Sequence, residues 1–427
     1  MMLLSVPLCE MVCGQIQGLW APRIGPLSLA QAYHCIMLCV VCFYLVSCLR
    51  RRAERPLVID VCIAIFLLTA GISTTMALRH NSHLSEDIIA FSQILYWILM
   101  WLIYAVECST AEGRRLVLTG VFAAGVYMAI SVIVLFVVGG ETYSRYEGVG
   151  ASFGGFSTAK SLGGILCVAA LLSLRVKSPS WQATLLCVTV TALLLTYQRA
   201  GQLAILAAIL WMVGVRVASR MKGSLLSSRS IVAFACAILV GAAFIDTEAL
   251  TQRWNNADIT LGDKAGSGRL GLWNDALSAF ETMNWPSKML GLGYSGMREA
   301  MRDEGMGGNR KHTHSDMLDI LLAFGCLGML GWIAIHYAMI QTVRTRAKTS
   351  TEYVIGGAVY VVFLVESLVT GQVFGPATMI VYLGTITGLC RVGNEMRAST
   401  RPVPVAPEDV RHSTTVWRPP AWAAHGI

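Results

Sequence analysis

Apolar runs of roughly 20 residues recur along almost the whole chain, and they are the feature that most restricts its fold. A hydrocarbon core about 30 Å thick requires about 20 mostly apolar residues in a helix that crosses it. Hydrophobic residues make up 55% of the 427 residues, charged residues make up 14%, and the mean hydropathy is +0.60. This combination predicts an all-α polytopic membrane protein.

The runs predict about eleven transmembrane helices, with a twelfth left open. Their expected ranges are 29–49, 57–78, 88–108, 116–138, 158–174, 182–196, 201–217, 231–245, 317–340, 353–373 and 377–390. The expected organisation is an N-terminal segment (1–28), eight spans (29–245), one long loop (246–316), three further spans (317–390) and a tail (391–427).

Basic residues concentrate in every second predicted loop. They follow the first, third, fifth, seventh and ninth spans, and are Arg50, Arg51, Arg52, Arg55, Arg114, Arg115, Arg175, Lys177, Arg216, Arg220, Lys222, Arg229, Arg344, Arg346 and Lys348. Short loops rich in Lys and Arg stay preferentially in the cytoplasm, so these loops are expected there. The loops 79–87, 139–157 and 246–316 then face the other side, which makes the long loop external.

The two ends of the chain differ from the spans between them. Residues 1–28 carry Glu10 and Arg23 among polar neighbours, and are expected to form an external segment or an amphipathic re-entrant helix. A signal peptide is disfavoured, because no positively charged region precedes the first apolar run. Residues 391–427 are rich in Pro, Arg and Ser, and are expected to be a disordered cytosolic tail.

Charge and cysteine usage exclude several classes of function. The net charge of +8 is spread over the expected cytoplasmic loops and tail, so membrane topology explains it better than nucleic-acid binding. Most of the 13 cysteines fall within or beside the spans, as small membrane hydrophobes do. The sequence has no zinc-site spacing and no Walker or dinucleotide loop, so neither a metal nor another cofactor is expected.

Two arginines are predicted at the outer ends of helices. Arg199 lies between the sixth and seventh spans with almost no loop around it, where a guanidinium must pair or reach the interface. Arg269 begins a stretch with helical spacing of Leu270, Leu272, Trp273, Leu277 and Phe280. That helix would lie on the membrane surface or cap a cavity. Each arginine is either an anion clamp or an ordinary interfacial charge.

The segment HTHSDMLD, from His312 to Asp319, joins polar residues directly to an apolar span. A helix that begins near Ser315 would carry on one face His314, Leu318, Leu321, Gly325 and Gly328. Thr313 and Asp316 resemble a capping box, and the glycines would admit a neighbouring helix or a lipid chain. His314 is therefore a capping residue or part of a basic cavity suited to a lipid-linked diphosphate.

Ordered motifs in this region resemble those of a known family. They are R-x-x-L-W from Arg269, P-x-x-x-L-G-x-G-Y from Pro286, and H-x-H-S-D-x-L-D from His312. The spacing from His314 through Gly325 also matches the pattern H-[NSQ]-x9-G-x-x-[GTY]. Together they resemble the shared domain of O-antigen ligases and of polysaccharide polymerases of the Wzy and exopolysaccharide types, over about a third of the chain.

The resemblance implies a membrane-embedded glycosyltransferase of the GT-C type at the periplasmic face of the bacterial inner membrane. It would be inverting and metal-independent, with undecaprenyl-diphosphate-linked glycan as donor, a glycan acceptor, surrounding membrane lipid, and a flippase and a chain-length regulator as partners. Arg199 and Arg269 would hold the diphosphate, and His314 would be catalytic. Lys160, in a segment resembling the family's K-N-x-L-G element with Ser161 in place of Asn, would add a diphosphate contact.

His312, Asp316 and Glu366 are expected to support this site. Glu366 lies inside the tenth span and needs an arginine or a bond to another helix as a partner. The resemblance leaves open a polymerase, which extends lipid-linked repeats, and a ligase, which transfers the chain to lipid A core; the motifs favour the polymerase slightly. A transporter or flippase is the alternative of another class, but the spans show no clear internal repeat.

Overall fold

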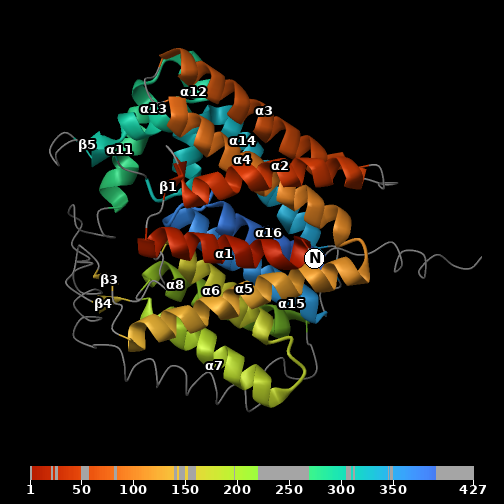
Figure 1. Cartoon of the computed structure of the whole chain (residues 1–427). Helices are drawn as coiled ribbons and strands as arrows, with labels where there is room; N and C mark the ends of the chain where they lie inside the picture. Colours follow the sequence, from red (N-terminus) through yellow and green to blue (C-terminus); the bar gives the residue numbers. More distant parts are fainter. Residues whose placement is uncertain are drawn as a thin grey trace, which may run out of the picture.

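Helices account for nearly all of the regular structure in the computed structural model (Figure 1). The structure describes residues 2–20, 23–24, 27–49, 57–80, 84–138, 142–143, 150–151, 160–196, 198–219, 269–303, 309–310, 313–344, 346 and 350–390. The predicted eighth span (231–245) and the predicted tail (391–427) lie outside these residues.

The helices before the long loop are α1 (Met2–Trp20), α2 (Leu29–Leu49), α3 (Leu57–His80), α4 (Leu84–Glu107), α5 (Ala111–Val137), α6 (Lys160–Ser173), α7 (Pro179–Leu195) and α8 (Arg199–Ser219). Those that follow are α11 (Arg269–Thr282), α12 (Trp285–Leu290), α13 (Gly293–Ala300), α14 (Asp316–Arg344), α15 (Thr351–Val369) and α16 (Pro376–Cys390). The described strands form three short antiparallel pairs: β1 (Arg23–Ile24) with β2 (Leu27–Ser28), β3 (Thr142–Tyr143) with β4 (Gly150–Ala151), and β5 (Arg302–Asp303) with β6 (Asn309–Arg310).

Five helices of the described chain are long and apolar enough to cross a membrane: Ser85–Glu107, Ala111–Val137, Arg199–Ser219, Asp316–Arg344 and Thr351–Val369. The other expected spans in the described residues coincide with shorter apolar helical stretches. The predicted class, an all-α multi-pass membrane protein, is confirmed at this level. The N-terminal segment, for which two alternatives were open, contains α1, which packs against α5.

Local sequence explains where several helices begin. The Thr110 side chain accepts the Gly113 N–H at 3.0 Å at the start of α5, and the Ser350 side chain accepts the Tyr353 N–H at 3.1 Å at the start of α15. These caps satisfy N–H groups that have no partner within the helix. Pro179 occupies the first turn of α7, where a missing N–H does no harm.

Aromatic side chains connect the central helices. Phe66 of α3, Trp97 of α4 and Phe363 of α15 surround Trp332 of α14, with ring centroids 6.0, 6.4 and 6.0 Å from that of Trp332. All four side chains are completely buried. Lipid offers little hydrophobic drive for association, so close packing of this kind holds membrane helices together.

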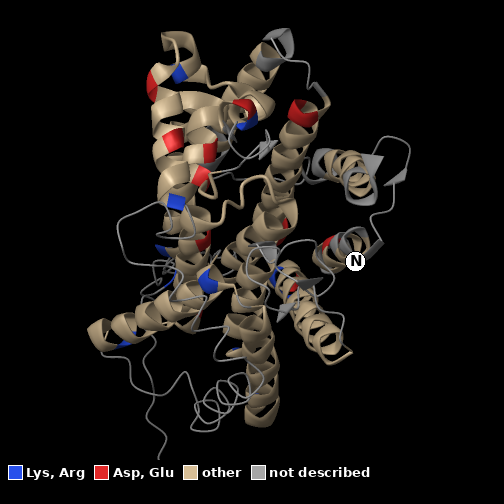
Figure 2. Ribbon diagram, turned by 90° about the vertical axis from the view of Figure 1, so that its left-hand side faces the viewer, with Lys and Arg blue, Asp and Glu red and all other residues tan. Residues whose placement is uncertain are grey.

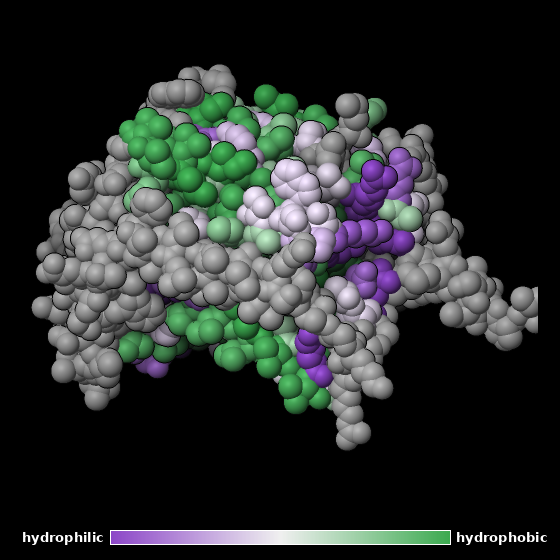
Figure 3. Space-filling view, turned by 90° about the horizontal axis from the view of Figure 1, so that it is seen from below, coloured by the Kyte–Doolittle hydropathy of each residue, from purple (hydrophilic) through white to green (hydrophobic). Residues whose placement is uncertain are grey.

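The two ends of the bundle are formed by different segments of the chain. The turn before α14, the connection between α15 and α16, and the helices α11 to α13 lie at one end, here called the α11–α13 end (left-hand side of Figure 1; facing the viewer in Figure 2). The opposite end holds the turns 108–110 and 174–178 and the connection between α14 and α15. Seen from below, apolar side chains cover much of the described surface, and hydrophilic ones gather toward that opposite end (Figure 3).

Helix α14 is broken at Gly325, whose φ of 67° and ψ of −166° are not helical. The break exposes the Leu322 carbonyl, which accepts the Leu292 N–H at 2.9 Å from the turn between α12 and α13. A Cβ on Gly325 would lie 2.4 Å from the Met289 carbonyl group, and one on Gly291 would lie 2.2 Å from the Ala323 oxygen. The glycines therefore admit the α12–α13 turn, which is backbone of the same chain.

Gly325→Ala is expected to lower the free energy of unfolding by about 3 kcal/mol or more, because the added Cβ meets backbone and the residue has positive φ. Gly271→Ala in α11 is the matched control, since a Cβ there meets nothing within 4 Å and alanine favours a helix. Thermal unfolding of the detergent-solubilised protein measures both. Equal midpoints for the two variants would contradict the role given to Gly325.

Candidate active site

His314 lies in a tight turn directly before α14. Its φ of 59° makes it the one non-glycine residue of the described chain with positive φ. Such strain persists only where neighbours hold the backbone, and it is frequent at functional sites. Here the Thr313 N–H and hydroxyl both donate to Asp319 Oδ1, at 3.0 and 2.7 Å, and the Ser315 N–H donates to the Thr313 hydroxyl at 3.1 Å. The turn is thus held from both sides of His314.

Two expectations about the start of α14 are wrong. The Thr313 hydroxyl donates to Asp319 and not to Asp316. The turn before α14 directs the Thr313 side chain toward Asp319, which lies one helical turn after Asp316. The expected common face of His314 with Gly325 and Gly328 is also absent, since that spacing presumes a continuous helix. His314 precedes the helix in a left-handed conformation, and Gly325 interrupts it.

Asp316 is fully buried and connects two segments that are distant in sequence. Its Oδ1 accepts the backbone N–H of Gln372 and that of Val373, the latter at 2.7 Å. Both donors belong to the connection between α15 and α16. Asp316 therefore holds this connection against the turn that contains His314.

Asp319→Ala is expected to lower the free energy of unfolding by about 1–3 kcal/mol, because it leaves the buried Thr313 N–H without an acceptor. Asp319→Asn keeps an Oδ1 acceptor for both Thr313 donors and should retain most of the stability. Thermal unfolding of the two variants compares them. If the asparagine variant lost as much as the alanine variant, hydrogen bonding to Thr313 would not be what holds the turn.

Glu366 is a completely buried carboxyl near the end of α15. Its Oε2 accepts from the Thr370 hydroxyl at 2.7 Å, the Gln372 amide at 3.3 Å and the Gln198 amide at 3.4 Å. An ionisable group within a membrane helix is costly unless its hydrogen-bonding capacity is used. Gln198 directly precedes α8, so Glu366 does bond to a residue outside its own helix.

Arg199 and Arg269 are both half-buried and begin α8 and α11. Burial and the positive charge of Arg199 lower the pKa of Arg269, whereas the carboxylate of Glu366 raises it. Arg269 is therefore within electrostatic range of both Arg199 and Glu366. Because an arginine stays protonated at ordinary pH, two positive charges meet at the α11–α13 end, an arrangement that favours an anion between them.

Helix α11 is also fastened to the His314 turn. The Trp273 indole N–H donates to the Thr313 carbonyl at 3.0 Å. Trp273 lies four residues after Arg269, so both side chains project from the same face of α11. This contact brings Arg269 to the part of the molecule where His314 lies.

Two glycines of α6 make room for the polar groups around Glu366. A Cβ on Gly163 would lie 1.9 Å from Gln198 Oε1, and one on Gly164 would lie 1.8 Å from the Tyr382 hydroxyl. The K-S-L-G-G stretch therefore contributes through its glycines. Lys160 is the first residue of α6, but its side chain lies outside the described residues, as does the whole of His312.

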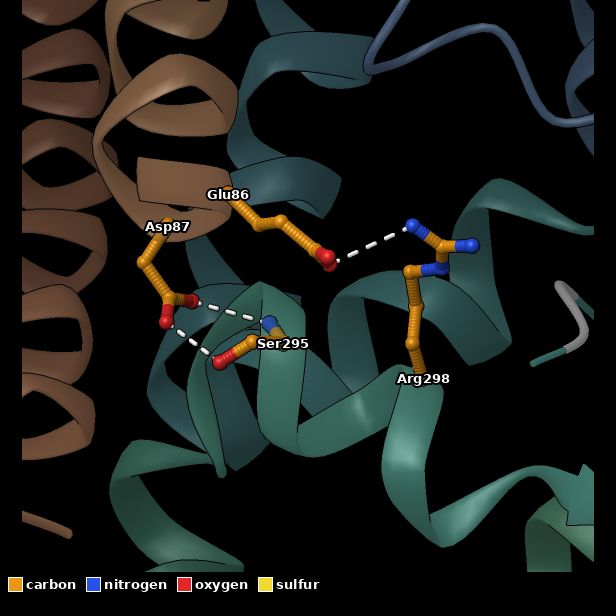
Figure 4. Close-up of polar contacts among 4 residues, drawn as sticks. All are labelled: Glu86, Asp87, Ser295 and Arg298. Carbon is orange, nitrogen blue, oxygen red and sulfur yellow. Dashed lines mark hydrogen bonds and ion pairs between the residues drawn. The ribbon is translucent and has the colours of Figure 1, made fainter. Parts of the chain in front are cut away.

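Polar contacts also hold α13 against α4 (Figure 4). Asp87 is 1% exposed and accepts the Ser295 N–H at 2.9 Å as well as the Ser295 hydroxyl. Beside it, the Arg298 guanidinium is 3.3 Å from Glu86 and lies over the Tyr294 ring. The end of the P-x-x-x-L-G-x-G-Y motif is thereby fixed to the bundle.

The structure brings the predicted arginines and Glu366 together and links them to the His314 turn through Trp273 and Asp316. Sequence reasoning missed Gln198, Gln372 and Asp319 as parts of this arrangement. Two of them carried a signal in the sequence. Asp319 is part of the H-x-H-S-D-x-L-D motif, and Gln198 is a polar residue in a very short connection between two spans. Gln372 offered no such signal, because only the packing of the α15–α16 connection places it.

Fold and site together define a class of protein. It is a multi-pass helical membrane protein that carries a buried carboxyl, two arginines and a strained histidine at one end. Residues 183–333 match the family model described as O-antigen ligase, so this part of the chain is an O-antigen ligase family domain. The match runs from α7 to α14 and contains Arg199, Arg269 and His314. A search among curated proteins gave no match.

The domain confirms the resemblance drawn from the short motifs. It implies a membrane enzyme of the O-antigen ligase and polysaccharide polymerase type, which transfers a lipid-linked glycan.

Proposed function

We propose that the protein is a membrane glycosyltransferase that polymerises undecaprenyl-diphosphate-linked oligosaccharide repeats into exopolysaccharide or O-antigen. The observation that carries this proposal is that Arg269 lies within electrostatic range of Arg199, on a helix that is hydrogen-bonded to the His314 turn, within the family domain. Paired guanidinium groups suit the oxygens of a diphosphate, because each offers a rigid fork of N–H donors.

The proposed reaction is an inverting displacement at the anomeric carbon of the donor. His314 takes the proton of the acceptor hydroxyl while that oxygen bonds to the anomeric carbon. The bond from this carbon to the diphosphate oxygen breaks, and the lipid diphosphate leaves with the electron pair. Arg199 and Arg269 stabilise the charge that it acquires, and the proton on His314 passes to solvent.

The remaining predicted residues have secondary roles in this proposal. Lys160 adds a contact to the diphosphate, and His312 keeps the supporting role that the family motif assigns to it. Asp316 acts as a positioning residue, because it holds the α15–α16 connection against the His314 turn. Glu366 keeps Gln198, and with it the start of α8, in place. The reaction requires neither a metal nor a nucleotide sugar.

We place this site at the periplasmic face of the bacterial inner membrane. Arg114, Arg175 and Arg346 lie together at the end of the bundle opposite to Arg199 and Arg269. Basic residues near span ends favour the cytoplasm, which leaves the α11–α13 end outside. A flippase that supplies the repeat and a chain-length regulator are the partners that such a polymerase would need.

A ligase is the second candidate, favoured by the description of the family model itself. In that reaction the same donor is used, but the finished chain is transferred to lipid A core. The diphosphate-binding arginines and His314 would keep the roles given above.

The length distribution of lipid-linked glycan in a deletion strain, complemented with wild-type or His314→Asn protein, tests the proposal. Single repeats that accumulate on undecaprenyl diphosphate at the periplasmic face are expected without active protein. Long chains that remain on this lipid would assign the ligase reaction instead. Repeats trapped at the cytoplasmic face would indicate a transporter and overturn the catalytic proposal.

A further inference from the structure

A cavity lies at the end of the bundle opposite to the candidate active site. Its volume is about 650 Å³, and it is formed by the start of α5, the turn between α6 and α7, the connection before α15, and the end of α16. The side chains at this cavity include Arg114, Arg115, Arg175, Lys177 and Arg346. We refer to it as the basic cavity.

The charge of the basic cavity is strongly unbalanced. Among the residues that the structure describes, five basic side chains line it and Glu352 is the one acidic lining residue. Cations gathered in one cavity repel each other, so an anion that enters lowers the electrostatic energy. No group proposed for glycan transfer is among its described lining residues, and these residues all lie outside the family domain.

Two of the arginines are held in position by backbone. The Arg114 guanidinium donates to the Cys108 carbonyl at 3.2 Å, and Arg346 Nε donates to the Leu389 carbonyl at 3.1 Å. A guanidinium has five N–H donors, so one such bond orients the group and leaves capacity for an oxyanion. Preorganised donors of this kind suit phosphate oxygens.

The cavity continues from this charged end into apolar surface. Arg114, Leu118 and Phe122 line it at intervals of four residues, and so follow one face of α5 toward the middle of the membrane. Leu172 adds apolar surface from α6. A ligand that fits both parts has an anionic group at the helix ends and a hydrocarbon chain beside α5, which describes a phospholipid.

We propose that the basic cavity binds the headgroup of an anionic phospholipid, preferentially one with more than one phosphate. Its acyl chain lies along Leu118 and Phe122. In the proposed topology this lipid belongs to the cytoplasmic leaflet, where basic cavities between spans bind such headgroups. The tail that follows Cys390 is a poorer occupant, because it carries more arginines than acidic residues. A soluble anion would gain nothing from the apolar part.

The test uses native mass spectrometry of the delipidated full chain, titrated with tetraoleoyl cardiolipin or with dioleoyl phosphatidylcholine. Wild-type protein is expected to retain cardiolipin at much lower lipid concentration than phosphatidylcholine. The double variant Arg115→Gln, Arg175→Gln removes two exposed cavity charges, and should lower the cardiolipin affinity about tenfold or more. Phosphatidylcholine binding should stay unchanged.

Two controls separate the cavity from general surface charge. Arg344→Gln removes an exposed arginine at the same end but outside the cavity, and should keep wild-type affinity. The double variant Arg115→Lys, Arg175→Lys keeps both charges and should stay close to wild type. Equal affinity in the double glutamine variant and wild type, or an equal loss in Arg344→Gln, would overturn the proposal.

A competition separates the lipid from a soluble anion. Sodium pyrophosphate at millimolar concentration should not displace cardiolipin, because it lacks the chain that contacts Leu118 and Phe122. Complete displacement by pyrophosphate would assign the basic cavity to a soluble phosphate compound and overturn the lipid proposal.

Discussion

His314→Asn is expected to lower the rate of glycan transfer by about 100-fold to 10,000-fold, the range over which general base catalysis acts. Asparagine tolerates the left-handed conformation that His314 adopts, so the turn before α14 should keep its shape. The amide cannot take up the proton of the acceptor hydroxyl. Turnover of lipid-linked repeats by purified protein in detergent or vesicles measures the effect.

The His314 prediction needs proof that the variant is folded. Its thermal midpoint should lie close to that of wild type, and His314→Gly, which removes the strain of positive φ, should be at least as stable. Both variants should be equally inactive despite their different backbone preferences. Transfer within about threefold of wild type in a folded asparagine variant would exclude His314 as the base.

Arg199→Gln and Arg269→Gln are each expected to lower the transfer rate by about 100-fold to 1,000-fold, because each removes a donor to the leaving diphosphate. Arg199→Lys keeps the charge but loses the fork of donors, so it should remain strongly impaired if the contact is bidentate. A lysine variant with near-normal activity would mean that charge alone matters at this position.

Arg298→Gln is the matched control for these arginine variants. Arg298 belongs to α13 at the same end of the bundle, but it pairs with Glu86 of α4 and has no role in the proposed reaction, so its loss should leave transfer nearly unchanged. In the double variant Arg199→Gln, Arg269→Gln, the fold-loss of transfer rate should be smaller than the product of the two single fold-losses, because both groups bind one diphosphate. Independent effects that multiply fully would contradict a shared ligand.

Much of this arrangement could be predicted because it depends on local pattern. Apolar runs predicted the helices of the bundle, and apolar spacing after Arg269 predicted a helix that the structure shows as α11. Arg199 could be identified from the sequence because a guanidinium between two spans must pair or reach the membrane interface, whatever the arrangement of the spans. The same reasoning predicted that Glu366 needs a hydrogen-bonding or charged partner, but it did not identify Gln198 as that partner.

The start of α14 shows where local pattern fails. Periodicity assumes a continuous helix, but His314 has positive φ and Gly325 breaks the hydrogen-bond ladder. Both departures depend on contacts with residues distant in sequence. Met289 and Leu292 occupy the break at Gly325, and Trp273 donates to the Thr313 carbonyl in the turn beside His314.

By itself the sequence determined that this chain is helical and crosses a membrane, because burial in lipid requires long apolar runs that no other environment demands. It also determined which few polar residues stand at helix ends. Only the tertiary structure decided that Asp319 holds Thr313, that Asp316 binds the α15–α16 connection, and that two arginines meet near Glu366. Hydrogen bonds and charge contacts act over a few ångströms, so they depend on how distant segments pack and not on their spacing along the chain.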